Sequence, residues 1–171
     1  MNAKTKPASD TSGVHLWLVL WKATAAVKAH ALRNITELGM GLSDFAVLEL
    51  LLNKGPSPVN AIGRRVLLTS GSCTAAVDRL EKKGLVVREW DEQDRRVCRV
   101  RLTPAGRGLI SGAFRQHADA MEAATAALSQ PERKSLLALL KKLGFGAAAL
   151  SMSETASEPN AGKRPAKPSR P

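Results

Sequence analysis

The most informative pattern in the sequence lies in the stretch TSGSCTAAVDRLEKKGLVVREWDEQDRRVCRVRL, residues 69–102. In its first half, apolar residues recur at three- and four-residue steps, which is the spacing of an amphipathic helix. In its second half, the pattern changes to two short runs rich in β-branched residues, which predict strands joined by a polar loop. The expected elements are a helix capped by Thr69 or Ser70 and running to Lys83, strands over 85–90 and 97–102, and a loop over 91–96.

The predicted helix has two faces of different chemistry. Cys73, Val77 and Leu80 share the apolar face, whereas the opposite face carries small residues near its N-terminal end and cations further along. A helix that enters the DNA major groove needs this arrangement, because its N-terminal end must approach the base edges closely. An ordinary amphipathic surface helix is the alternative that this segment alone leaves open. The residues expected to contact DNA are Thr69, Ser70, Gly71, Ser72, Thr74, Ala75, Asp78 and Arg79.

The polar loop between the two strands places Arg95 and Arg96 at its tip, beside Asp91 and Asp94. A guanidinium on a thin loop fits the narrow minor groove, where the negative potential is high. A neighbouring carboxylate can hold such a side chain in position through a bidentate pair. A solvated charged turn is the alternative. Because the loop directly follows two helices joined by a tight turn, we interpret the hairpin as the wing of a winged helix, with these four residues binding DNA.

Outward from this stretch, the chain is predicted to be helical on both sides. The expected helices are one over Val14–Leu38, one capped by Ser43 and closed by Gly55-Pro56, a short one opened by Ser57 or Pro58 and reaching Leu67, one from Thr103-Pro104 to about Leu128, and one capped by Ser129 and running from Pro131 to about Leu143 before Gly144. The predicted fold is mainly α with a small β-hairpin: a winged helix-turn-helix lobe plus a helical lobe. The expected domain covers 13–146, with a core at 42–103, between a disordered arm over 1–12 and a disordered basic tail over 147–171.

Composition narrows the class of partner. The chain has 171 residues and a formal net charge of +11, from 26 Lys and Arg against 15 Asp and Glu. The excess of positive charge indicates a polyanionic binding partner. The segment 56–103 has ten basic against six acidic residues, a mixture that is more typical of a structured binding surface than of a non-specific basic arm. Three Phe, three Trp and no Tyr argue against a platform that stacks several RNA bases.

The inventory of reactive side chains argues against an enzyme. Cys73 and Cys98 can form neither a disulfide framework nor a four-ligand zinc site. His15, His30 and His117 show no paired ligand spacing, and the sequence has no recognisable nucleophile–base pair or carboxylate pair. We therefore expect no catalytic site, no metal and no cofactor, in a reducing cytoplasmic setting.

The apolar run at 16–21 follows Lys4 and Lys6, a pattern that a signal peptide would share. Lys22 interrupts the run and the helical spacing continues beyond it, which favours a helix. No apolar stretch approaches the ~18 residues of a membrane span. We therefore expect no membrane partner.

Four stretches carry a more specific signal when they are taken together. They are Leu42-Ser43-Asp44-Phe45-Ala46-Val47-Leu48, then Val77-Asp78-Arg79-Leu80-Glu81-Lys82-Lys83-Gly84-Leu85-Val86, then Asp91-x-x-Asp94-Arg95-Arg96, and finally Val100-Arg101-Leu102-Thr103-x-x-Gly106. In this order and spacing, residues 42–110 resemble the multiple antibiotic resistance regulator (MarR) family of winged helix-turn-helix transcription factors. The similarity in helical layout extends over about 14–145.

The resemblance implies a DNA-binding regulator. It implies that the start of the helix after Thr69 reads the major groove, that the wing residues bind the minor groove, and that the first and last helices intertwine in a homodimer. Ser70, Gly71 and Ala75 depart from the family pattern, because many members carry a basic or larger polar group at these positions. We expect a repressor that binds a pseudo-palindromic double-stranded DNA operator and is released by a small-molecule or oxidant effector. A winged-helix module that binds protein, or binds DNA non-specifically without ligand response, is the alternative.

The resemblance also implies a small-molecule pocket near the DNA-binding lobe. Trp17, Trp21, His30, Phe45 and Phe114 are the candidates to line it, and packing in a dimer core is the alternative for each. Residues 69–72 are similar to those of members said to respond to phenols, quinones or oxidants, which makes a role in stress response one expectation. For Cys73, a redox site and inert packing on the apolar face both stay open; Cys98 follows the same logic.

Overall fold

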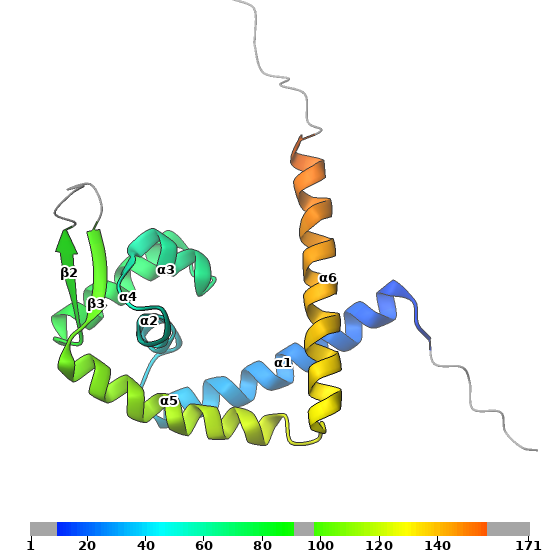
Figure 1. Ribbon diagram of the computed structural model, residues 1–171, viewed down its shortest axis with the longest axis horizontal. Helices are drawn as coiled ribbons and strands as arrows, with labels where there is room; N and C mark the ends of the chain where they lie inside the picture. Colours follow the sequence, from blue (N-terminus) through cyan, green and yellow to red (C-terminus); the bar gives the residue numbers. More distant parts are fainter. Residues whose placement is uncertain (1–9, 91–97, 157–171) are drawn as a thin grey trace, which may run out of the picture. The chain divides into compact units, whose positions relative to one another are not determined.

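The computed structural model describes residues 10–90 and 98–156 of the chain. It comprises two units: residues up to Thr125, and the helix that follows. In chain order the elements are α1 (Gly13–Glu37), α2 (Leu42–Lys54), β1 (Ser57–Pro58), α3 (Val59–Arg65), α4 (Ser70–Lys82), β2 (Val86–Trp90), β3 (Cys98–Leu102), α5 (Pro104–Ala124) and α6 (Gln130–Ala156) (Figure 1). The expected mainly helical winged fold is confirmed.

The sheet has three strands rather than the predicted two. Its order is β1-β3-β2, and all pairings are antiparallel. β2 and β3 form the expected hairpin, with Val86 opposite Leu102 and Trp90 opposite Cys98. β1 was missed, because a two-residue strand that contains proline shows no alternation. It pairs Ser57 with Val100 and so ties the segment before α3 to the hairpin.

One core holds the winged lobe together. Its largest fully buried side chains come from α2, α3, α4, α5 and both hairpin strands, so the two helices of the helix-turn-helix and the wing share a single apolar centre. Apolar burial of this kind stabilises a fold by about 25 cal/mol per Å² removed from water. Those side chains are Val47, Leu48, Leu51, Ile62, Cys73, Val77, Leu80, Val86, Val100 and Ile110.

The helix boundaries confirm two predicted caps and correct one. Thr69 and Thr103 cap α4 and α5, their hydroxyl oxygens accepting backbone N–H bonds three residues on. Ser43 is not the N-cap of α2: the cap is Gly41, and Ser43 lies in the first turn. α3 ends at Arg65, two residues before the predicted end, because Leu67 adopts a left-handed conformation with φ 56° that a helix cannot contain.

Gly106 is required where α5 begins. A Cβ on Gly106 would lie 1.9 Å from the carbonyl oxygen of Leu85, at the entrance to β2. The same carbonyl accepts the Thr103 N–H bond at 3.0 Å, so α5 starts in close contact with the hairpin. This contact accounts for the glycine three residues after Thr103 in the sequence signature.

α6 is described by itself. It was expected to end at about Leu143 but continues through Gly144 and Gly146 to Ala156, which corrects the disordered tail predicted over 147–171 for its first ten residues. Single glycines cost only about 1 kcal/mol in a helix, and the alanines that follow are strong helix formers. α5 ends at Ala124, four residues before the predicted Leu128. Among the described residues, no helix is long and apolar enough to cross a membrane.

Candidate nucleic-acid interface

The first turn of α4 presents small side chains on an exposed surface. Thr69 and Ser72 are occupied in capping: the Thr69 oxygen accepts the Ser72 N–H at 3.2 Å and its hydroxyl donates to the Ser72 hydroxyl at 2.9 Å. A Cβ on Gly71 would meet nothing within 4 Å, so its backbone is open to a partner. The exposed positions of the predicted set that remain on this turn and the next are Ser70, Gly71, Thr74 and Ala75.

Arg79, expected to contact DNA, is engaged within the protein. Its Nη2 donates to Asp44 Oδ1 at 2.6 Å and to the Ser43 hydroxyl at 3.0 Å. Asp44 is buried at 6% exposure in the first turn of α2, and Lys83 approaches its other oxygen at 3.6 Å. Arg79 therefore holds α4 against α2, a role that the sequence did not reveal.

Asp78, the other charged residue of the predicted set, joins α4 to the wing. Arg88 of β2 donates to Asp78 Oδ1 at 2.6 Å and also forms an ion pair with Glu81. The backbone N–H of Arg88 donates to Glu81 as well, at 3.2 Å. This cluster fixes the wing strands relative to α4.

The four predicted wing residues, Asp91, Asp94, Arg95 and Arg96, lie outside the described residues. The structure does show what carries them: the β2–β3 hairpin, whose last described pair is Trp90 with Cys98. At the root, Arg101 of β3 forms an ion pair with Glu89 of β2 across the strands. The loop therefore leaves a hairpin that packs on the core at one end and is tied to α4.

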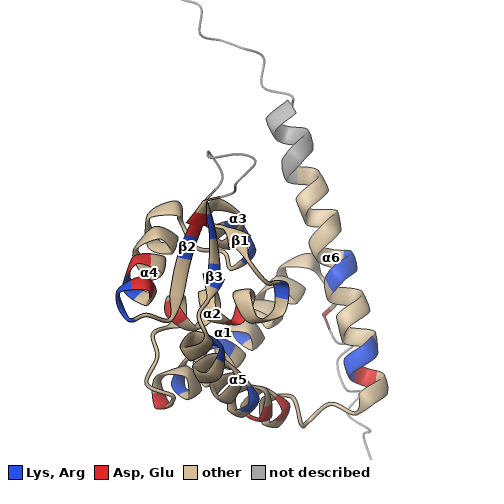
Figure 2. Ribbon diagram, turned by 60° about the vertical axis from the view of Figure 1, so that its left-hand side comes forward, with Lys and Arg blue, Asp and Glu red and all other residues tan. Residues whose placement is uncertain are grey.

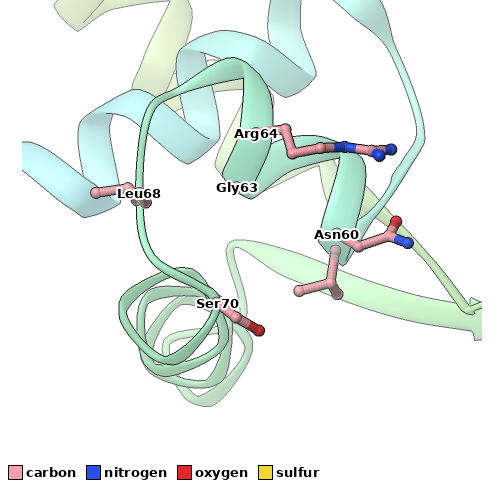
Figure 3. A pocket seen from close by; sticks show the side chains of 6 residues that line it. Asn60, Gly63, Arg64, Leu68 and Ser70 are labelled. Carbon is pink, nitrogen blue, oxygen red and sulfur yellow. The ribbon is translucent and has the colours of Figure 1, made fainter. Parts of the chain in front are cut away.

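A cavity of about 210 Å³ lies between α3 and the start of α4 (Figure 3). Asn60 and Arg64 of α3 and Ser70 of α4 supply its polar groups, and the remaining lining residues are Val59, Gly63 and Leu68. Because the first turn of α4 leaves backbone N–H groups unbonded within the helix, this edge combines a cation with helix-end donors. The sequence analysis did not assign Asn60 or Arg64 to a site. The feature that could have identified them is their position in α3, the first helix of the helix-turn-helix.

Charge on the winged lobe is interleaved rather than gathered on one face. Basic and acidic residues lie together on α4 and on β2, while the charged residues of β3 are basic (Figure 2). The acids described above are mostly occupied by arginines: Asp44 by Arg79, and Asp78 by Arg88. Because these charges are paired, this part of the surface has no uniform positive potential. The shape of the surface therefore determines how a polyanion binds.

The five predicted pocket residues fall into two groups. Trp17 and Trp21 stack on each other, with ring centroids 6.3 Å apart, and both are about 60% exposed on the first half of α1. Phe45 is buried in the core and Phe114 packs against it, while half-buried His30 bonds the Ala120 carbonyl of α5 at 3.0 Å. The cavity described above is lined by none of the five.

A polar cluster joins α1, α2 and α5 beside His30. His117 of α5 bonds Asn34 of α1 through Nδ1 at 2.9 Å, and its ring meets Phe45 edge-on at 4.8 Å. Burial lowers the pKa of His117; the charge of Glu49 opposes this and that of His30 adds to it. The sequence singled out His30 but not His117, whose only signal was its distance of three residues from Phe114.

The geometry of Cys73 favours packing over the redox alternative. Its side chain is 1% exposed and its thiol donates to the Val59 carbonyl at 3.5 Å. Burial raises the pKa of the thiol, which disfavours the reactive thiolate. Cys98 is half-buried at the start of β3, and neither cysteine forms a disulfide.

Comparison with known proteins places this arrangement among transcriptional regulators. The sequence profile described as MarR family matches residues 41–98. The HTH-type transcriptional regulator MhqR of Bacillus subtilis is 38% identical over 132 residues, covering 77% of this chain and 91% of MhqR. A probable transcriptional regulator from Pseudomonas aeruginosa superposes with a TM-score of 0.64 at 31% identity, covering 74% of this chain and 94% of that one.

A structure of mutant MarR from E. coli complexed with operator DNA has the same fold. It superposes with a TM-score of 0.67 at 22% identity, covering 76% of this chain and 94% of that one.

Proposed function

This chain belongs to the MarR family of DNA-binding transcriptional regulators, and from that premise we propose that it acts as a homodimeric repressor on a pseudo-palindromic operator. Each protomer places the start of α4 in the major groove of one half-site, and the half-sites lie about one DNA turn apart. Effector binding releases the DNA. Repression, dimerisation and effector release are typical of the family.

The observation that carries this proposal is the exposed first turn of α4. Ser70 and Gly71 have small side chains, so the helix backbone can approach base edges that a larger residue would keep at a distance. Thr69 caps the turn, which leaves the N–H groups of Ser70 and Gly71 directed outward with the positive end of the helix dipole. Thr74, one turn on, adds a hydroxyl that can reach either a base edge or a phosphate.

The wing supplies the second contact. Arg95 and Arg96 are proposed to enter the adjacent minor groove, and Asp91 and Asp94 to orient them. The ion pairs of Arg88 with Asp78 and Glu81 support this assignment, because they hold the hairpin at a fixed distance from α4. A structure with this fold has been determined in complex with operator DNA, which supports DNA binding in general.

The dimer is proposed from apolar surface that the isolated protomer leaves uncovered. On α1, Trp17 and Trp21 are 60% and 59% exposed. On α6, five leucines between residues 136 and 143 are each at least 40% exposed. Burial of these side chains against a second copy would remove their apolar surface from water.

For the effector, we propose the junction of α1, α2 and α5 as the binding region. His30, Phe45 and Phe114 of the predicted set lie there with His117, so apolar rings and hydrogen-bonding imidazoles occur together. A small aromatic molecule with one polar substituent matches that chemistry. Trp17 and Trp21 are assigned to the dimer surface instead.

The test is selection of bound duplexes from a random-sequence pool, followed by affinity measurements on the best duplex at several salt concentrations. We expect a pseudo-palindromic site, a sedimenting species of two protomers, and for Arg96→Ala a weaker affinity with a salt slope reduced by about 1 per half-site. Arg115→Ala, which removes an exposed cation from α5, is the matched control and should leave both unchanged. Failure to enrich any sequence would favour non-specific binding or a protein partner.

A further inference from the structure

Trp90 is a large apolar residue exposed at the root of the wing. It is the last residue of β2 and is 64% exposed, although it belongs to the same hairpin whose other end is buried in the core. Its cross-strand neighbour is Cys98, a small side chain that covers little of an indole. An exposed tryptophan beside the predicted DNA-contact loop indicates a binding partner, because burial of such a large apolar ring lowers the free energy of a complex.

The face of the hairpin that carries Trp90 is settled by strand alternation. Side chains two residues apart point to the same side, so Trp90 shares its side with Arg88 and Val86. Val86 is buried in the core, and Arg88 bonds Asp78 and Glu81 of α4. Trp90 therefore lies on the side of the hairpin that faces α4, one step beyond the cluster that joins them. β2 lies beside α4 (Figure 1).

We propose that Trp90 packs against the sugar–phosphate backbone of DNA. The inference rests on the proposed function, in which α4 occupies a major groove and the wing loop the adjacent minor groove. In duplex DNA one backbone strand separates the two grooves. That strand must pass between α4 and the loop, and so across the root of the wing on its α4 side, where Trp90 lies.

The chemistry of the indole matches a backbone contact. Its flat ring covers the C–H surface of a deoxyribose, and its Nε1–H can donate to a phosphate oxygen. It has two side-chain torsions to fix on binding, against the four or more of lysine or arginine. Contacts to sugar and phosphate set the position of a protein on DNA without reading sequence. Trp90 thus positions the wing, while its contribution adds to that of the charged loop without depending on salt.

The experiment compares wild type, Trp90→Ala, Trp90→Phe and the control Leu109→Ala, which removes another exposed apolar side chain from α5. The probes are the duplex selected by the wild-type protein and a random-sequence duplex of equal length. We expect Trp90→Ala to lose about tenfold in affinity for both duplexes with an unchanged salt slope, and Trp90→Phe to lose about threefold or less. Leu109→Ala should bind as wild type does.

A second readout is quenching of tryptophan fluorescence by iodide, with and without the selected duplex. The difference between wild type and Trp90→Phe isolates the signal of Trp90 from Trp17 and Trp21, and we expect DNA to protect it. Unchanged affinity in Trp90→Ala, or an indole that stays accessible in the complex, would overturn the inference. A loss confined to one base-pair substitution would also overturn it, because it would indicate base readout. If the wild-type protein binds neither duplex, it is the proposed function that fails.

Discussion

Arg79 in α4 and Asp44 in the first turn of α2 form an ion pair, with Nη2 of the arginine 2.6 Å from Oδ1 of the aspartate. The carboxylate is almost fully buried, whereas the guanidinium is half exposed. A guanidinium held in this way fixes α4 against α2. We propose that the small residues at the start of α4 contact DNA, while the ion pairs of Asp78 and Arg79 hold the helix in place.

The ion pair is expected to couple the stability of the two helices. Asp44→Ala and Arg79→Ala should each lower the free energy of unfolding by about 1–2 kcal/mol, since each leaves a partner group less well paired. The double variant should lose about 1 kcal/mol less than the sum. Urea denaturation at a fixed protein concentration measures this, with Asp119→Ala, an exposed acid on α5, as the control. Strict additivity would show that the two residues act independently.

Leu67 in the turn between α3 and α4 stores backbone strain. Its φ is 56° and its side chain is 92% exposed, so burial of the side chain does not offset the cost of the left-handed conformation. Leu67→Gly should raise the free energy of unfolding by about 1 kcal/mol. Gly55→Ala, at φ 73°, should lower it by about as much. A loss of stability in Leu67→Gly would mean that the leucine side chain makes contacts that offset the strain.

His117 is expected to make stability depend on pH. Because burial lowers its pKa in the folded protein, the unfolded chain binds more protons as the pH falls below the ordinary histidine value of about 6.5. Its contribution to stability is therefore constant above that value and is lost on acidification towards the folded pKa. His117→Gln should reduce the change in the urea midpoint between about pH 7.5 and 5.5. His15→Gln, on exposed α1, should leave that change as it is in wild type. An equally steep profile in His117→Gln would assign the effect to other groups.

Cys73 is expected to be silent toward oxidants. Cys98→Ser leaves Cys73 as the only cysteine, and because its side chain is 1% exposed, peroxide should not change the DNA affinity of that variant. Cys73→Ala should instead lower the free energy of unfolding by about 1–2 kcal/mol through lost packing. Release of DNA from peroxide-treated Cys98→Ser would restore the redox interpretation.

Local signals in the sequence were enough to predict the winged lobe. The apolar spacing around Val77 gave α4, the β-branched runs gave the hairpin, and the threonine caps at 69 and 103 marked two helix starts within one residue. These features depend on contacts a few residues apart. β1 depends instead on a partner more than forty residues away, with Ser57 opposite Val100, and nothing local announces it.

Pairing between distant charges limited prediction of the site. The sequence assigned Asp78 and Arg79 to DNA because they lie on the exposed face of α4. Their ion pairs with β2 and α2 were not predicted. Alternation along β2 held one unused hint: Arg88 falls on the same side as buried Val86, and a charge on that side requires a counter-ion. The glycines past residue 143 led to a predicted helix end at about Leu143, whereas α6 continues to Ala156. A helix can continue through a single glycine when good helix formers follow.

The most direct test of the account is the affinity of Gly71→Ala for the selected duplex, compared with wild type and with Gly108→Ala. Both glycines lie in helices where an added Cβ would meet nothing within 4 Å, so both variants should fold with unchanged or slightly higher stability. Only at Gly71 would the methyl group stand between the α4 backbone and DNA. We expect a loss of about tenfold or more for Gly71→Ala and none for Gly108→Ala. Wild-type affinity in Gly71→Ala would contradict the placement of this turn against DNA.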